Sequence, residues 1–251
     1  MAKKKPRTPT PPRKVQAPQR RPNAPRAKAD DLGRQHRNLL YALSGSGIVA
    51  LVVVVVVIAA FGGGGKTISD AQISTAFTSA GCTYRTVAGY LPSGQNMHTT
   101  SLTKTPMPWN TNPPSNGQHY YLWAVWGFYT GPVNPRRVLH NEEHGAIVEW
   151  WGPHVSQATI AKLRAFYNQQ PIGGFGTPYP SLGSKIAFTA WTGDPFKYQR
   201  NGYYGQGHVA ICSSFTPKVQ AAAELFRRAY RGHGPEGIPL SADHPGMGPN
   251  G

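Results

Sequence analysis

The stretch Leu139–Trp151 reads L-H-N-E-E-H-G-A-I-V-E-W-W and joins a pair of histidines to a run of alternating apolar residues. From Ala146 onwards, β-branched and aromatic side chains follow one another in the pattern of a strand. Gly145 comes directly after His144, so the histidine pair meets this strand without a helix between them. The stretch therefore predicts a strand inside a folded domain, with His140 and His144 immediately before it.

Helices and further strands are predicted on both sides of this stretch. One helix begins with a capping box formed by Ser69 and Gln72. A second helix begins after Ser156, and a third begins after Thr216, with Pro217 in its first position. Other strand-like runs are Thr83–Tyr90, Lys185–Trp191 and His208–Cys212. This order predicts a single α+β domain with a mostly antiparallel sheet and about three helices.

The positive charge is concentrated at the N-terminus. Residues 1–37 hold 12 Lys or Arg against Asp30 and Asp31, in a chain whose formal net charge is +16. This segment is rich in proline and poor in large apolar side chains, which predicts a disordered tail. Because the high pI comes mostly from the tail, we expect no nucleic-acid-binding domain. The tail would instead be a solvated segment that determines the membrane topology, lying near anionic lipid of the inner membrane leaflet.

A membrane anchor is predicted directly after the tail. Leu39–Phe61 is 23 residues long and uncharged, enough to cross the roughly 30 Å hydrocarbon core of a bilayer. A cleaved signal peptide is the alternative, but the basic region is long and the apolar run extended. We therefore expect a transmembrane helix over residues 38–61.

The basic residues before the predicted helix indicate its orientation. Arg34 and Arg37 precede it, which favours a cytoplasmic N-terminus. A Gly-rich linker (62–68) would lead to an extracytoplasmic domain (69–231), followed by a flexible Gly/Pro-rich tail (232–251). The prediction is a single-pass protein of the cell membrane.

The two cysteines agree with this placement. Cys82 and Cys212 lie near the two ends of the predicted outer domain, and an oxidising compartment favours their pairing. A bridge over so long a loop could stabilise the fold by roughly 4–5 kcal/mol. Two buried free thiols are the alternative, which would require a reducing compartment.

Several histidines gather in one apolar, weakly charged part of the sequence. His119 ends the loop sequence N-P-P-S-N-G-Q-H, and His140 and His144 follow in H-N-E-E-H. This density of imidazoles is typical of a transition-metal site. We predict His119, His140 and His144 as metal ligands, with His98 as a further ligand.

Neighbouring residues would complete the predicted site. Glu143 is a candidate ligand, a candidate acceptor that orients an imidazole, and a candidate general base. Met97 offers a thioether, and Asn141 suits a kink in the backbone. Four imidazoles, or three with a thioether, would favour copper, whereas three with a carboxylate or water would favour zinc.

The backbone between the paired histidines decides whether they can share an ion. H-N-E-E-H fits the inverted zincin pattern H-x-x-E-H, which requires a helix. Pro135 upstream and Gly145 downstream argue against a helix, so a metalloprotease is disfavoured. On a regular strand His140 and His144 would be about 13 Å apart. Joint coordination would then need a turn or bulge within Asn141–Glu143.

Other chemistries have little support in the sequence. Among the outer domain's acids, only Glu142 and Glu143 lie beside the histidines, so paired-carboxylate hydrolysis is disfavoured. The run Gly173–Gly176 lacks the lysine of a phosphate-binding loop and is interpreted as a turn. The alternative to a metal site is a metal-free interaction module of the cell envelope. Its aromatic loops would contact an envelope protein, and its histidines would bond backbone carbonyls.

Three motifs resemble those of the domain of unknown function 3105 family. They are N-P-P-S-N-G-Q-H-Y at Asn112–Tyr120, W-G-F-Y at Trp126–Tyr129 and L-H-N-E-E-H-G at Leu139–Gly145. The resemblance extends from roughly Gly94 to Trp191. Members of that family commonly carry similar Pro-Pro and His-Asn motifs, often behind one transmembrane helix in prokaryotes.

This resemblance implies a shared site and no particular activity. The residues that match the family motifs are His119, His140, Asn141, Glu143, His144 and Gly145. Glu142 departs from the family pattern, which has an apolar residue there.

Overall fold

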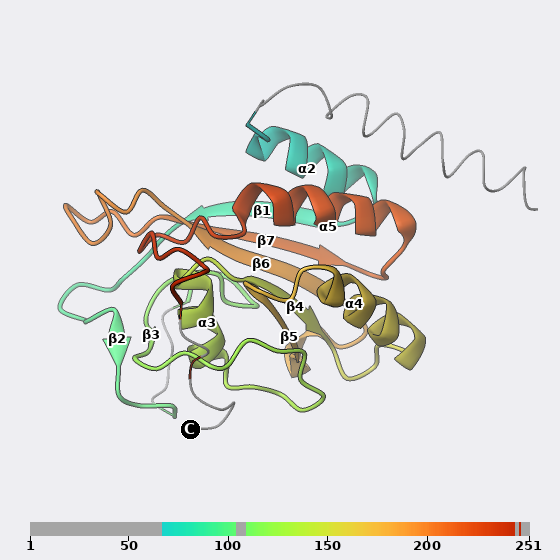
Figure 1. Ribbon diagram of the computed structural model, residues 1–251, viewed down its shortest axis with the longest axis horizontal. Coiled ribbons are helices and arrows are strands. Elements are labelled where there is room, and N and C mark those ends of the chain that lie inside the picture. Colours follow the sequence, from blue (N-terminus) through green and yellow to red (C-terminus); the bar gives the residue numbers. More distant parts are fainter. Residues whose placement is uncertain (1–66, 104–108, 244–245, 247–251) are drawn as a thin grey trace, which may run out of the picture. The chain divides into compact units, whose positions relative to one another are not determined.

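The computed structural model describes residues 67–103, 109–243 and 246 (Figure 1). The predicted tail (1–37), the predicted membrane helix (38–61) and most of the predicted linker (62–68) lie outside these residues. Among the helices of the described ranges, none is long and apolar enough to cross a bilayer.

A five-stranded sheet forms the centre of the described domain. Its strands lie in the order β1-β7-β6-β4-β5, and every neighbouring pair is antiparallel except β4 and β5. The strands are β1 (Thr83–Ala88), β4 (Ile147–Trp151), β5 (Gly174–Pro178), β6 (Ile186–Thr192) and β7 (Gln206–Cys212). The predicted α+β class and mostly antiparallel sheet are confirmed.

Three helices begin where the capping residues predicted. They are α2 (Asp70–Ser79), α4 (Gln157–Gln169) and α5 (Pro217–Tyr230). The side chains of Ser69, Ser156 and Thr216 each accept a hydrogen bond from a backbone N–H of the first turn. These bonds satisfy N–H groups that have no partner within the helix, which explains why each helix starts at that residue.

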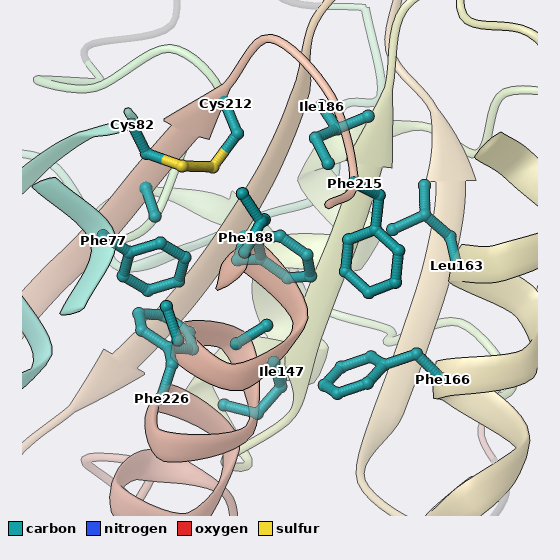
Figure 2. Close-up of a cluster of buried hydrophobic side chains, with 14 of the residues drawn as sticks. Phe77, Cys82, Ile147, Leu163, Phe166, Ile186, Phe188, Cys212, Phe215 and Phe226 are labelled. Carbon is teal, nitrogen blue, oxygen red and sulfur yellow. A yellow bond between two sulfur atoms is a disulfide. The ribbon is translucent and has the colours of Figure 1, made fainter. Parts of the chain in front are cut away.

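One face of the sheet packs against these three helices. Aromatic and aliphatic side chains from the sheet, such as Phe188, meet Phe77 of α2, Phe166 of α4 and Phe226 of α5 (Figure 2). The predicted disulfide is confirmed: Cys82, just before β1, bonds to Cys212 at the end of β7. The bridge lies at the edge of this core and ties the two neighbouring strands together.

The opposite face of the sheet packs against a fourth helix, α3 (Pro135–Glu143). Val138 of α3 lies in one cluster with Val148 and Trp150 of β4. Successive residues of a strand point to opposite faces of the sheet. In β4, Val148 and Trp150 therefore pack on the side of α3, whereas Ile147 and Trp151 pack on the side of the other three helices. The sequence did not predict α3, although it carries the H-N-E-E-H motif.

β5 was also missed, because its glycines were interpreted as a turn. An ideal Cβ on Gly176 would lie 2.3 Å from the ring of Phe128, so only glycine lets this ring pack on the strand. At Gly174 the space is less restricted, since an ideal Cβ would lie 3.1 Å from the carbonyl oxygen of Gln170 and 3.2 Å from the ring of Tyr167. The glycines therefore mark close packing against a strand.

Two small features lie beside α3. β2 (His98–Thr99) and β3 (His119–Tyr120) form a parallel pair, and a short 3₁₀ helix, η1 (Pro180–Leu182), follows β5.

Part of the segment that we expected to be a flexible tail, residues 232–243, returns to the end of α3. The N–H of Gly232 donates to the carbonyl of Gly145 at 2.8 Å.

Candidate metal centre

Helix α3 places His140 and Glu143 on one side, one turn apart. Asn134 caps its start, and Pro135 occupies the first turn, where its missing N–H costs nothing. Its end is a Schellman motif: Gly145 donates to the carbonyl of Glu142, and Ala146 donates to that of Asn141. The prediction that no helix forms here was wrong, since the proline and glycine used against a helix are its start and stop signals.

The pair β2–β3 brings two more histidines to this helix. His98 and His119 are register partners in the two strands. Their ring centroids are 4.8 Å apart, and each ring also lies within 5 Å of the His140 ring. Three imidazoles from three separate segments therefore converge beside α3.

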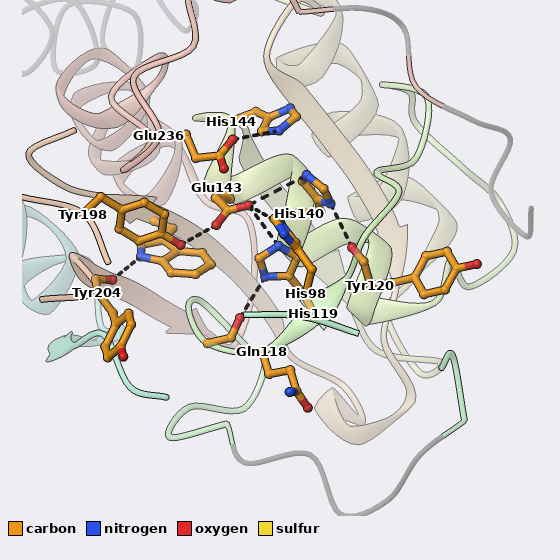
Figure 3. A network of polar contacts seen from close by, with 12 residues as sticks. His98, Gln118, His119, Tyr120, His140, Glu143, His144, Tyr198, Tyr204 and Glu236 are labelled. Carbon is orange, nitrogen blue, oxygen red and sulfur yellow. Dashed lines mark hydrogen bonds and ion pairs between the residues drawn. The ribbon is translucent and has the colours of Figure 1, made fainter. Parts of the chain in front are cut away.

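The three rings point one nitrogen each at the same carboxylate oxygen (Figure 3). Oε2 of Glu143 lies 2.9 Å from Nε2 of His119 and 3.1 Å from Nε2 of His98. It lies 3.8 Å from Nε2 of His140. One atom from each of these four residues lies within 4.8 Å of all the others. The set could hold a metal ion.

Backbone carbonyls fix the other nitrogen of two rings. Nδ1 of His119 is 2.8 Å from the carbonyl of Gly117, and Nδ1 of His140 is 2.8 Å from that of Tyr120. A carbonyl can only accept, so each Nδ1 carries the hydrogen. In the neutral rings Nε2 then presents its lone pair to the centre. This second contact is the one that metal-binding histidines usually make.

Burial and mutual charge set the protonation of the centre. Burial lowers the pKa of His140 to about 3, reinforced by His119 and opposed by Glu143. Burial alone would raise the pKa of Glu143, but His119, His98 and His140 lower it well below its usual range. The hydrogen bond to Glu143 raises the pKa of His98 despite partial burial. The centre thus contains an ionised carboxylate and at least one neutral imidazole at neutral pH.

Solvent reaches the centre from one side. The side chains of His119 and Glu143 are 0% exposed, whereas that of His98 is 38% exposed. An ion could therefore enter past His98 and then be enclosed by the other ligands.

A tyrosine and a tryptophan line the buried side. The hydroxyl of Tyr198 donates to Oε1 of Glu143, and burial followed by the Glu143 charge raises the tyrosine's pKa, so the hydroxyl stays protonated. Trp191 packs edge-on against His119, with ring centroids 5.7 Å apart. Nothing in the sequence pattern predicted Tyr198, because the loop that carries it is 55 residues from Glu143.

His144 lies beside the group formed by His98, His119, His140 and Glu143, with its ring centroid 4.6 Å from that of His140, but its ring nitrogens have other partners. It is the C-cap of α3, and its Nδ1 lies 3.1 Å from Oδ1 of Asp243. Its Nε2 lies 3.4 Å from Oε2 of Glu236. Burial would lower the pKa of His144, but Asp243 and Glu236 raise it to about 9. The structure thus places this expected ligand in an adjacent acidic group.

The other expected site residues support the centre from outside. The amide of Asn141 exchanges two hydrogen bonds with the backbone of Ala124 and so anchors a loop. Met97 is buried beside Leu139, and its carbonyl accepts the N–H of His119. These two residues thus hold the segments around the ligands.

Glu142 points to the sheet. It accepts a 2.7 Å hydrogen bond from Thr189 of β6. Burial raises its pKa well above the usual value, although the Thr189 bond opposes this effect. Glu142 is therefore part of the packing between α3 and the sheet.

Comparison with known proteins agrees with the motifs. Residues 101–201 match the model of a family described as "Protein of unknown function (DUF3105)". No curated protein and no solved structure matches the chain. The matched segment contains His119, His140, Glu143 and Tyr198, whereas His98 lies just before it. The resemblance to the DUF3105 family that the motifs predicted is therefore confirmed over residues 101–201.

Proposed function

We propose that this protein binds a zinc or copper ion through His98, His119, His140 and Glu143. Three imidazole nitrogens with one carboxylate oxygen suit zinc, and divalent copper accepts the same donors. The single observation that carries the proposal is the convergence of three Nε2 atoms on Oε2 of Glu143.

The metal-free alternative explains one of the two ring nitrogens of His119 and of His140. It accounts for the Nδ1 bonds of His119 and His140 to backbone carbonyls. It leaves their Nε2 lone pairs facing an ionised carboxylate in a buried site, where two acceptors repel each other. A proton on Nε2 would turn the contact of a single ring with Glu143 into a hydrogen bond, whereas a cation at the common point would satisfy all of the nitrogens together.

In this proposal Glu143 is a ligand, and its bond from Tyr198 orients it. This assignment replaces its candidate role as a general base. The role of the bound ion would be storage, delivery or a metal-dependent reaction step.

We further propose that the domain is extracytoplasmic and anchored by residues 38–61, with the basic tail near anionic lipid. The uncharged run Leu39–Phe61 supports the anchor. The disulfide between Cys82 and Cys212 supports an oxidising compartment.

Elemental analysis of the full-length protein tests metal binding. The protein is purified in detergent, incubated with zinc or with copper, desalted and analysed. We expect at least one bound equivalent, and a loss of at least one equivalent in His119→Gln and in His140→Gln. The control is His154→Gln, which removes an exposed histidine outside the centre and should bind as much metal as the unchanged chain.

Two results would overturn the proposal. One is a folded protein that retains neither zinc nor copper after desalting. The other is equal metal content in His119→Gln, His154→Gln and the unchanged chain.

A further inference from the structure

A second group of ligand atoms adjoins the centre and shares one residue with it. Glu143, His144 and Glu236 each offer one atom, and the three atoms lie within 4.8 Å of one another. Figure 3 shows Glu143 between the three converging imidazoles and the pair formed by His144 and Glu236. The side chain of His144 is 3% exposed and that of Glu236 is 26% exposed.

His144, like His119 and His140, has an acceptor at Nδ1 and a carboxylate near Nε2. One ring nitrogen, Nδ1, lies 3.1 Å from a carboxylate oxygen of Asp243. The other, Nε2, is directed at Glu236. A carboxylate on one imidazole nitrogen and a cation on the other is a common arrangement around metal ions.

The surroundings of His144 are rich in carboxylates. Glu143, Glu236 and Asp243 bring three carboxylates to a largely enclosed region, and the Asp243 side chain is only 2% exposed. Oδ2 of Asp243 is buried and has no hydrogen-bond partner among the described residues. A divalent ion between Glu143, Glu236 and His144 would take the place of the proton that lies between His144 and Glu236.

The fold builds this group from two segments. α3 supplies Glu143 and His144 at its end, and residues 232–243 supply the two other acids. Gly234 allows the close approach, since an ideal Cβ there would lie 2.2 Å from the carbonyl oxygen of Glu143. The acids are thus placed by backbone packing.

We propose that Glu143, His144 and Glu236 hold a second divalent cation, which makes the centre dinuclear. Glu143 is shared by the two ions, and Asp243 orients His144. This inference rests on the proposed metal-binding function. Ions that share a carboxylate are typically about 3.5–4 Å apart, close enough to act on one bound molecule.

Zinc stoichiometry tests the inference on the full-length protein. We expect two equivalents in the unchanged chain and one in both Glu236→Gln and His144→Gln. Glu224→Gln is the matched control, because Glu224 is a partly exposed glutamate on α5 and should leave two equivalents bound.

Divalent copper gives an independent readout of the same centre. Two coupled copper ions should show a weaker electron paramagnetic resonance signal per copper than one isolated ion. The Glu236→Gln protein should therefore give the full signal of a single site.

The outcomes separate the two proposals. One equivalent that is lost in His119→Gln but kept in Glu236→Gln overturns the second site and leaves the first intact. Two equivalents in both the unchanged chain and Glu236→Gln also overturn it, because the second ion then binds elsewhere. No bound metal in any protein overturns both proposals.

Discussion

At the scale of single residues, the described domain uses buried histidines in two ways. Around Glu143, ring nitrogens converge on a carboxylate. His208 of β7 instead has hydroxyl groups at both nitrogens: Tyr84 and Thr86 at Nδ1, and Thr192 at Nε2. It also stacks on Tyr230, with ring centroids 4.0 Å apart. His208 is therefore satisfied as a neutral ring in the core.

This neutral ring predicts a loss of stability in acid. Burial lowers the pKa of His208 to about 4 from 6.5, with Asp70 opposing the shift. A depressed histidine pKa stabilises the fold fully above pH 6.5, and that contribution is lost as the pH falls toward 4. Its size is about 3 kcal/mol.

The variant His208→Gln isolates this effect. It should be less stable at neutral pH, because it loses the stacking on Tyr230, but its stability should decline less between pH 6.5 and 4. Urea unfolding of both proteins across this range measures the difference. Parallel stability curves would contradict the prediction.

The site could be predicted from the sequence only in part at this scale. His119, His140 and Glu143 stood out because imidazoles and a carboxylate lie close together in an apolar stretch. The direction of each ring depends on backbone carbonyls such as that of Gly117, and residue types do not reveal these. Glu236 and Asp243 lie in a Gly/Pro-rich segment, so composition suggested a tail instead of ligands.

At the scale of secondary structure elements, α3 shows how a short helix escapes detection. It has nine residues, eight of them buried, so it has no exposed polar face to give a helical period. The helices α2, α4 and α5 have capping residues and one apolar face, and they were predicted well. For α3 the start and stop signals were present too, at Pro135 and Gly145, but they were interpreted as breaks.

The end of α3 carries an element-scale prediction. Gly145 has a φ of +94°, and an ideal Cβ would lie 2.8 Å from the Cα of Gly232. Gly145→Ala therefore combines backbone strain with a clash. Gly81 has a φ of +82° and open space around it, so Gly81→Ala brings strain alone, about 1–2 kcal/mol.

Denaturant unfolding of the two variants measures the comparison. Gly145→Ala should be the less stable protein, and it should also bind less metal, because Glu143 and His144 are displaced. Equal destabilisation by the two substitutions would show that residues 232–234 do not restrict this turn.

At the scale of the whole molecule, the disulfide closes a loop that contains most of the domain. Cys82 and Cys212 are 130 residues apart. The double variant Cys82→Ser/Cys212→Ser should lose about 3–5 kcal/mol of unfolding free energy, because its unfolded chain is less restricted.

Urea unfolding with and without a reductant measures this contribution. Reduction should destabilise the unchanged chain by a similar amount and leave the double variant unaffected. A reductant that does not change the stability of the unchanged chain would contradict the prediction.

The α+β class was predictable because strands and helices carry local signals. The five-strand order was not, since β5 depends on glycines such as Gly176, which accommodates Phe128 from a loop far upstream in the chain. The layer formed by α3 escaped because its helix is almost fully buried and because its proline and glycine signals were interpreted as breaks.

The pairing of β2 with β3 has a kinetic consequence. It is only two residues long, yet it sets His98 opposite His119. A shift of one residue would turn the His98 ring to the other side of the strand. So short a ladder has little strength of its own, and His98 is also the most solvent-accessible of the four proposed ligands. The residence time of a bound ion would then depend on how often the hydrogen bonds between β2 and β3 break. The three enclosed donors would release the ion only after His98 has moved out of the site.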